Sequence, residues 1–272
     1  MNIDSVVISH EPFVRLAFFA AIFAIVAIAE ALRPRRKLVA AKQKRWFNNI
    51  LLSVTDTIIL RLVFPIFPVG IAVFCKESGW GILNYFHFPL WIAVICGIVL
   101  LDLIIYWQHK MFHLVPIFWR LHKVHHIDQD IDVTTGLRFH PLEMILSMFI
   151  KMTAVAVIGA PPVSVVIFEI LLNGTTMFNH GNLHIPLAVD RFIRLLIVTP
   201  DMHRVHHSVI VRETNSNYGF NFSWWDRLFG TYRREPENGH LQMKIGLNGY
   251  FDPKYLQLPQ MLIIPFVSRR KD

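Results

Sequence analysis

The apolar run FVRLAFFAAIFAIVAIAEAL, residues 13–32, constrains the fold most, because it is long enough to cross a bilayer as one helix. A spanning helix needs about 20 predominantly apolar residues. Residues 50–74 and 88–107 also reach that length, although charged residues and two prolines interrupt the first of these. The pattern therefore predicts an integral membrane protein whose membrane segments are α-helices.

A longer apolar stretch, residues 142–178, has GAPP at its centre. Proline cannot continue a helix and restricts the residue before it, so the doubled proline predicts two short helices joined as a hairpin. Residues 192–199 are also compatible with a short interfacial helix.

The composition agrees with a membrane protein. The mean hydropathy is +0.43, and charged residues make up 17% of the 272 residues, against roughly a quarter in ordinary soluble domains. The net charge of +8 comes from basic residues beside apolar runs, which favours a membrane surface over nucleic acid. Cys75 and Cys96 form no CxxC pair, so we expect buried thiols. Acidic Asp4 and Glu11 precede the first run, whereas a cleavable signal peptide begins with basic charge.

The distribution of basic residues predicts the orientation of the chain. The segment RPRRKLVAAKQKR, residues 33–45, carries seven positive charges and no negative one. Since loops rich in Lys and Arg stay on the cytoplasmic side, we expect residues 33–49 inside, and the N-terminal tail and residues 75–87 outside. The third run then returns to the cytoplasm at Gln108, and the hairpin begins and ends there. We expect a bacterial inner membrane, or the endoplasmic reticulum membrane if the source is eukaryotic.

Ten histidines occur in four groups with helical spacing. Residues three or four apart on a helix point the same way, so each group offers two or three imidazoles to one point. Imidazole suits Fe, Zn, Cu or Ni, and no cysteine-based site accompanies these residues. Ten ligands exceed what one ion can take, which predicts two metal ions. The groups are His109 and His113; His122, His125 and His126; His180 and His184; and His203, His206 and His207.

The predicted orientation places all these histidines on the cytoplasmic side, just beyond the membrane. We therefore expect an all-α integral membrane bundle of about four to five helices or hairpins with a cytoplasmic histidine-rich helical cap. A pH-sensing patch or a loose metal-collecting loop would not need helical spacing repeated four times. The isolated His10, His87 and His240 are expected to be ordinary polar residues.

Carboxylates near these groups are candidates for orienting the histidines, because a metal-bound imidazole usually donates its other N–H to an acceptor. Asp102 lies seven residues before His109, two helical turns along the same face, and an aspartate inside an apolar run is costly. His140, in RFHP, is an alternative eleventh ligand, but a supporting role or a place at the start of the hairpin is favoured. The carboxylate candidates are Asp102, Asp201, Asp226 and Glu143.

The histidine motifs HKMFH, HKVHH, NHGNLH and HRVHH, in this order, resemble those of the fatty acid hydroxylase/sterol desaturase superfamily. LRFHP, TPDMHRVHHS and NYGFNFSWWDRLFGTY are similar too, within residues 95–235. The resemblance implies an integral-membrane, non-haem di-iron oxidase that uses O2 to attack an unreactive C–H bond in a lipid. It also implies that all ten grouped histidines are ligands of two iron ions. No catalytic residue beyond these ligands is predicted.

The resemblance further implies membrane-anchoring helices in residues 1–94, a catalytic domain in residues 95–235 and a C-terminal cytoplasmic tail in residues 236–272. Hydroxylation of a fatty acyl, sterol or related lipid is preferred, with desaturation as the alternative because the family contains both. A metal transporter is the alternative from another class, but it should place its ligands inside the spans rather than beyond their ends. The hairpin of residues 142–178 is expected to line the substrate channel.

The electrons for O2 chemistry are expected to come from outside the chain. The sequence has no flavin or dinucleotide fingerprint and no recognisable haem module. A separate ferredoxin- or cytochrome-like electron-transfer protein with its reductase is therefore implied. The basic surface near Arg33–Arg45 is the expected docking site for that donor.

Overall fold

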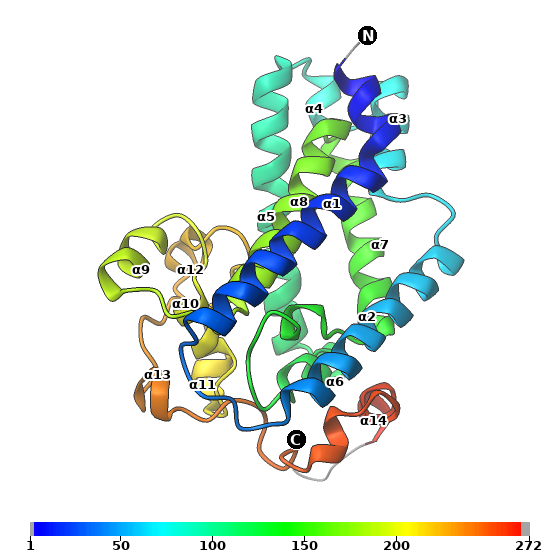
Figure 1. Cartoon of the computed structure of the whole chain (residues 1–272). Helices are drawn as coiled ribbons and strands as arrows, with labels where there is room; N and C mark the ends of the chain where they lie inside the picture. The colour runs from blue at the N-terminus through cyan, green and yellow to red at the C-terminus, as the bar shows by residue number, and fades with distance from the viewer. Residues whose placement is uncertain (1–2, 268–272) are drawn as a thin grey trace.

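The computed structural model describes residues 3–267. Within that range all the regular secondary structure is helical (Figure 1). Most of the long helices run towards one end of the molecule, and the short helices of the C-terminal part of the chain gather at the other end. Pairing of extended backbone among these residues is limited to isolated β-bridges, such as that between Pro34 and Leu183. The predicted all-α architecture is thus confirmed, whereas the side of the membrane that the short helices face stays a prediction.

The long helices are α1 (Ile3–Leu32), α2 (Lys42–Val63), α5 (Leu90–Leu114), α7 (Pro141–Ile158) and α8 (Pro162–Asn179). Between them lie α3 (Pro68–Ser78), α4 (Ile82–Tyr85), α6 (Pro116–His126) and the 3-10 turn η1 (Thr135–Leu137). The remainder holds α9 (Leu187–Ile193), α10 (Pro200–His206), α11 (Val211–Thr214), α12 (Trp224–Leu228), α13 (Gly239–Gln242), η2 (Pro253–Leu256), α14 (Leu258–Ile263) and η3 (Ile264–Phe266).

Five segments of the described chain are long and apolar enough to cross a membrane, in agreement with the predicted number. They are His10–Leu32, Lys42–Tyr85, Leu90–Leu114, Pro141–Ile158 and Pro162–Asn179. The second segment is not one continuous helix, because α2 ends at Val63 and α3 begins at Pro68. The ring of Pro68 suits the first turn of a helix but cannot continue one from before it.

The predicted hairpin is formed by α7 and α8. α7 ends at Ile158 and is capped by Gly159, whose φ of 67° is the left-handed conformation that glycine adopts without strain. The backbone of Gly81 packs directly on this turn, since a Cβ on Gly81 would lie 2.3 Å from Gly159 Cα. The segment between α3 and α4 is thereby fixed against the tip of the hairpin.

α8 lies between α1 and α5 in the bundle (Figure 1). Its Val165 and Phe168 are fully buried in one cluster with Leu101 of α5 and Val155 of α7. This packing fixes the end of α5 relative to the end of α8. Both ends carry histidines of the predicted groups.

The described part of the C-terminal segment packs back on the body. Met261 and Ile264 are buried in one cluster with Leu52 of α2 and Val124 of α6. Arg120 of α6 also donates its Nε hydrogen to the carbonyl oxygen of Pro265 over 2.7 Å. Helix α6 is therefore held between α5 and the C-terminal segment.

α9 buries the acidic Asp190 and turns its apolar side chains outward. Asp190 and Arg194 form a buried ion pair, whereas Leu187 and Phe192 are 52% and 73% exposed. This helix begins before the expected residues 192–199. An exposed apolar face outside the five candidate spans marks a surface that contacts something other than water.

Candidate metal centre

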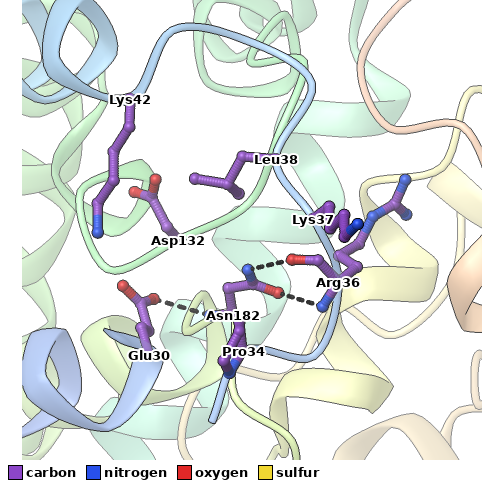
Figure 2. Close-up of a pocket in the computed structure, with 8 residues that line it drawn as sticks. All are labelled: Glu30, Pro34, Arg36, Lys37, Leu38, Lys42, Asp132 and Asn182. Atoms are coloured by element: carbon purple, nitrogen blue, oxygen red, sulfur yellow. Dashed lines mark hydrogen bonds between the residues drawn. The ribbon is translucent and has the colours of Figure 1, made fainter. Parts of the chain in front are cut away.

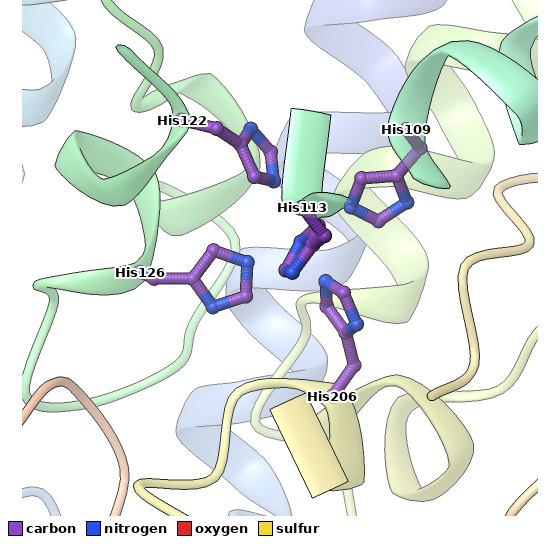
Figure 3. Close-up of side chains that lie close together, drawn as sticks. All are labelled: His109, His113, His122, His126 and His206. Carbon is purple, nitrogen blue, oxygen red and sulfur yellow. The ribbon is translucent and has the colours of Figure 1, made fainter. Parts of the chain in front are cut away.

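Nine of the ten predicted histidines gather in two groups where α5, α6, α10 and the end of α8 meet. Within each group the possible ligand atoms lie within 4.8 Å of one another. Figure 3 shows one group, with rings from α5, α6 and α10 turned towards a common point. The first group is His109, His113, His122, His126 and His206, and the second group is His125, His180, His203 and His207.

The two H-x-x-H-H motifs divide their histidines between the groups in opposite ways. On α6, His122 and His126 are one helical turn apart and enter the first group, while His125 points to the second. At α10 the pair one turn apart enters the second group, and His206 points to the first. The rings of His126 and His207, one from each group, stack with centroids 4.5 Å apart. The groups are therefore adjacent.

His184 lies outside both groups. The expectation that His180 and His184 share a helical face is wrong, because α8 ends at Asn179 and His180 caps it. The chain then turns away, and the backbone N–H of His184 donates to the carbonyl oxygen of Arg33 over 3.0 Å. The side chain of His184 is exposed.

Backbone carbonyls fix the orientation of four rings. A carbonyl can only accept, so the Nδ1 atom that contacts it must carry the hydrogen, which leaves Nε2 with its lone pair. The pairs are His109 with Tyr218 at 2.7 Å, His125 with Arg138 at 3.1 Å, His180 with Thr176 at 2.7 Å and His206 with Ser216 at 2.7 Å.

In the second group, lone pairs meet in a way that suits a cation. Nε2 of His180 lies 3.0 Å from Nε2 of His125 and 3.0 Å from Nε2 of His203. Since His125 and His180 both donate through Nδ1, their Nε2 lone pairs face each other, which is repulsive unless a cation lies between them. A metal ion bound by both nitrogens would remove this repulsion, because each lone pair would then be donated to the ion.

In the first group, the inward nitrogens have no hydrogen-bond partner within residues 3–267. The Nε2 atoms of His109, His122 and His206 are buried and accept no hydrogen bond from the described residues. Buried polar atoms without partners are costly. A set of imidazoles without thiolates fits iron, zinc, copper or nickel. Both groups therefore fit the two metal ions that the sequence predicts.

Burial keeps the imidazoles in their metal-binding form. Loss of solvation, followed by repulsion from neighbouring imidazoles, lowers the pKa of His125, His126 and His207 well below 6.5. Burial lowers the pKa of His180 to about 3. A neutral imidazole offers its lone pair to a metal, so the groups are ready for a cation at neutral pH.

The part of the chain that carries the two histidine groups matches a known family. Residues 94–231, about half of the chain, match the model of the family described as fatty acid hydroxylase. The chain belongs to the fatty acid hydroxylase family. The resemblance predicted from the histidine motifs is thus confirmed. This fatty acid hydroxylase family member is an oxidoreductase, as predicted.

The relatives of this family member include several lipid enzymes. Ornithine lipid hydroxylase OlsE of Rhizobium tropici is 27% identical over 235 residues, 83% of this chain and 68% of that protein. Alkylglycerol monooxygenase of Xenopus tropicalis is 33% identical over 161 residues, 58% of this chain but only 34% of that protein. Methylsterol monooxygenase 2-2 of Arabidopsis thaliana is 26% identical over 185 residues, 64% of this chain and 69% of that protein. No solved structure matches the chain significantly. The relatives favour neither the transporter nor the desaturase alternative.

Glu143 orients a histidine of the first group. Its Oε1 accepts a hydrogen bond from Nδ1 of His122 over 2.7 Å, and the carboxylate is 2% exposed. Of the four predicted carboxylates, Glu143 is the one with a direct contact to a grouped histidine among the described residues.

Asp102 has a different partner from the one expected. Its Oδ2 accepts hydrogen bonds from Nε1 of Trp225 at 2.8 Å and from the backbone N–H of Phe222 at 3.2 Å. The expected contact with His109 is absent, because a segment more than a hundred residues later inserts against this turn of α5. Asp102 therefore anchors that segment rather than a histidine.

Asp226 acts on a histidine through the backbone. Its carboxylate accepts hydrogen bonds from the N–H groups of Tyr218 at 2.8 Å and Gly219 at 2.9 Å. The carbonyl of Tyr218 in turn accepts from His109. Burial raises the pKa of Asp226, although hydrogen bonds from Thr231, Gly219 and Tyr218 oppose the shift.

Asp201 also lacks a contact with a grouped histidine among the described residues. It forms ion pairs with Arg204 on its own helix and with Arg35 at 3.0 Å, so it fixes α10 to the basic segment. Nε2 of the nearby His240 lies 2.9 Å from Glu235. His240 is therefore a partnered polar residue, and it lies outside the two groups.

His140 starts the hairpin. Its Nδ1 accepts the backbone N–H of Leu142 at 3.1 Å, which caps α7. Nε2 lies 3.3 Å from the carbonyl oxygen of Leu262. His140 belongs to neither histidine group, so the role at the start of the helix is the one that the structure gives it.

Two kinds of supporting residue were not predicted from the sequence. The carbonyl acceptors of the histidines are backbone atoms, and any residue could supply them. The loop after α6 is held by buried Arg45, which donates to Asp128 at 2.6 Å and to Asp132 at 2.6 Å. This loop leads to Arg138, whose carbonyl orients His125. Aspartates spaced by two, in IDQDID, are the only trace of that network in the sequence.

Proposed function

We propose that this chain is a di-iron lipid hydroxylase that binds one iron ion in each histidine group. The observation that carries the proposal is the pair of adjacent all-histidine groups whose Nε2 lone pairs converge. In the reaction, one oxygen atom of O2 enters a C–H bond as a hydroxyl, and the other leaves as water. Two electrons and two protons must be supplied from outside.

The residues around the groups suit such chemistry. Iron bound there would supply the activation of O2 that acid–base side chains cannot provide. Phe139 stacks on His125 with centroids 4.6 Å apart, and Phe220 lies 4.7 Å from His109. These apolar rings exclude water from the histidine nitrogens. Glu143 and the backbone carbonyls hold the rings in one orientation and one tautomer.

A membrane lipid is the substrate that the architecture favours. The histidines lie at the ends of candidate membrane spans, so an apolar chain can approach from the bilayer while its headgroup stays in water. Relatives named for ornithine lipid, alkylglycerol and methylsterol substrates support a lipid. Those names also support hydroxylation over desaturation. We propose the hairpin α7–α8 as a wall of the substrate channel.

The electron donor is a separate protein on this proposal. The exposed Arg33, Lys37 and Lys44 of the basic segment offer a surface for an acidic ferredoxin- or cytochrome-like partner. The excess of positive charge also supports a cytoplasmic position for the histidine groups in a bacterial inner membrane.

Mass spectrometry of total lipids from cells with and without the gene tests the function. We expect one lipid class to become heavier by one oxygen only when the chain is present. Replacing His203 by Ala should abolish the product, whereas His184→Ala, outside both groups, should retain it. A lipid lighter by two hydrogens would instead indicate a desaturase. An unchanged lipid profile, with iron-loaded protein in the membrane and a reductant supplied, would contradict the proposal.

A further inference from the structure

A pocket lies where the first candidate span ends, beside the segments that carry the second histidine group (Figure 2). Its volume is about 270 Å³. The lining residues are Glu30, Pro34, Arg36, Lys37, Leu38, Lys42, Asp132 and Asn182. Glu30 belongs to the last turn of α1, and basic residues follow directly, so the pocket sits at the level expected for lipid headgroups.

Glu30 is a buried carboxylate with one oxygen unused. The side chain is 5% exposed. Its Oε1 accepts the backbone N–H groups of Val133 at 2.8 Å and Asn182 at 2.7 Å, while Oε2 has no hydrogen-bond partner among the described residues. A buried carboxylate oxygen without a partner is costly. It points to a ligand that carries an N–H donor, most simply an ammonium.

The opposite charge on the pocket wall comes from lysines. Lys37 and Lys42 are exposed and form no ion pair within residues 3–267. Nζ of Lys42 lies 4.6 Å from the ring centroid of Trp46, a cation–π contact that restrains this side chain. These two ammonium groups suit an oxyanion, either a carboxylate or a phosphate.

The other charged groups of the wall have protein partners. Arg36 donates an Nη1 hydrogen to the carbonyl oxygen of Met243 at 3.0 Å, although its buried Nε has no partner among the described residues. Asp132 accepts from Arg45 at 2.6 Å and from Trp46 at 3.2 Å. The groups left for a ligand are thus the Glu30 carboxylate, the Lys42 ammonium near it, and the Lys37 ammonium on the other side of the pocket.

We propose that this pocket binds the zwitterionic headgroup of a membrane lipid, with its ammonium at Glu30 and its oxyanion at Lys37 and Lys42. The inference rests on the proposed function, because it names the headgroup class of the lipid that the enzyme hydroxylates. Asn182 follows His180 by two residues, and Val133 lies in the loop after His126. A headgroup held there is bound by the same segments that build the metal centre.

Lipid binding to the purified full chain tests the proposal. The chain, without added iron, is offered equal amounts of phosphatidylethanolamine and phosphatidylglycerol with identical acyl chains, and native mass spectrometry counts the lipids retained. Both lipids carry a phosphate, but only the first carries an ammonium. We expect a preference for phosphatidylethanolamine of roughly tenfold, the size of one charge-assisted hydrogen bond.

Variants separate the two halves of the site. Glu30→Gln should abolish the preference, and Lys42→Glu should weaken retention of both lipids. Lys44→Glu removes an equally exposed lysine of α2 that does not line the pocket, so it should change neither. Equal retention of the two lipids by the unaltered chain would overturn the proposal. So would identical behaviour of Lys42→Glu and Lys44→Glu, a comparison that holds even if Glu30→Gln fails to fold.

The headgroup site and the proposed function can be refuted independently of each other. Binding needs neither iron nor O2, so a selective pocket in a chain without hydroxylase activity would overturn the function and leave the headgroup site. A hydroxylated lipid formed by a chain without headgroup preference would overturn the headgroup site and leave the function.

Discussion

His122 donates its Nδ1 hydrogen to Oε1 of Glu143 over 2.7 Å, and this bond ties the first histidine group to the start of the hairpin. Both side chains are almost completely buried. A negative acceptor makes the imidazole a stronger ligand and fixes its tautomer. The bond therefore joins a residue of a membrane segment to the metal site.

Replacing Glu143 by Gln should lower metal affinity, because the amide keeps the shape but loses the charge. We expect a loss of about 10- to 100-fold, the usual effect of removing such a partner. Iron titration of the purified chain measures it. Glu77→Gln, an exposed carboxylate far along the sequence, is the control. Equal affinity in both variants would show that Glu143 only fills space.

Each H-x-x-H-H motif contributes histidines to both groups, so replacing one histidine should affect the ion of its own group. His126→Ala removes a ligand of the first group, and His125→Ala removes a ligand of the second. Each single variant should fall from about two bound ions per chain towards about one. Elemental analysis of iron-loaded protein measures the ratio. Complete loss of metal in both variants would mean that the nine histidines act as one indivisible site.

The metal-free chain should begin to lose stability at a higher pH than protonation of its carboxylates alone would cause. The pKa values of the buried His125, His126 and His207 lie well below 6.5 in the fold, whereas in the unfolded chain they return to about 6.5. Between those values the unfolded state binds more protons, so stability falls as pH falls. We expect the thermal midpoint to drop progressively from pH 7 to pH 5. A midpoint that stays constant over this interval would contradict the burial of these rings.

α9, whose apolar side chains face outward, should lie in the interfacial layer of the membrane. Its outward Phe192 is 73% exposed, and apolar faces of this kind insert at the headgroup boundary. A spin label at Phe192→Cys should relax more with O2, which is soluble in lipid, than with a water-soluble nickel chelate. Leu241→Cys, 63% exposed on α13, should show the opposite ratio. Similar ratios at both positions would place α9 in water.

Periodicity and hydropathy were enough to predict the helical membrane bundle and the two-metal grouping. Apolar length determines a span, and spacing of three or four places His122 and His126 on one face whatever else the chain does. His184 was misplaced because a spacing of four from His180 puts both residues on one face only if α8 continues past Asn179. Where α8 ends depends on how the following segment packs, which the spacing does not reveal.

The orienting contacts were predictable only in part. Glu143 lies in the first turn of α7 and contacts His122, and the sequence had marked it as a candidate carboxylate. Asp102 lies two turns before His109 on the same helix, but its carboxylate binds Trp225 from a distant segment instead. Backbone acceptors such as the carbonyl of Tyr218 leave no mark on a sequence. The division into residues 1–94, 95–235 and 236–272 stays a prediction.

The most direct test of the central claim is oxygen labelling. Membranes that contain the chain, iron and a reducing system are supplied with isotopically labelled O2, and their lipids are analysed by mass spectrometry. We predict one labelled oxygen atom in a single lipid class, and none with His125→Ala or His206→Ala. A product whose oxygen comes from water, or an unchanged product with those two variants, would contradict a di-iron hydroxylase built on these histidines.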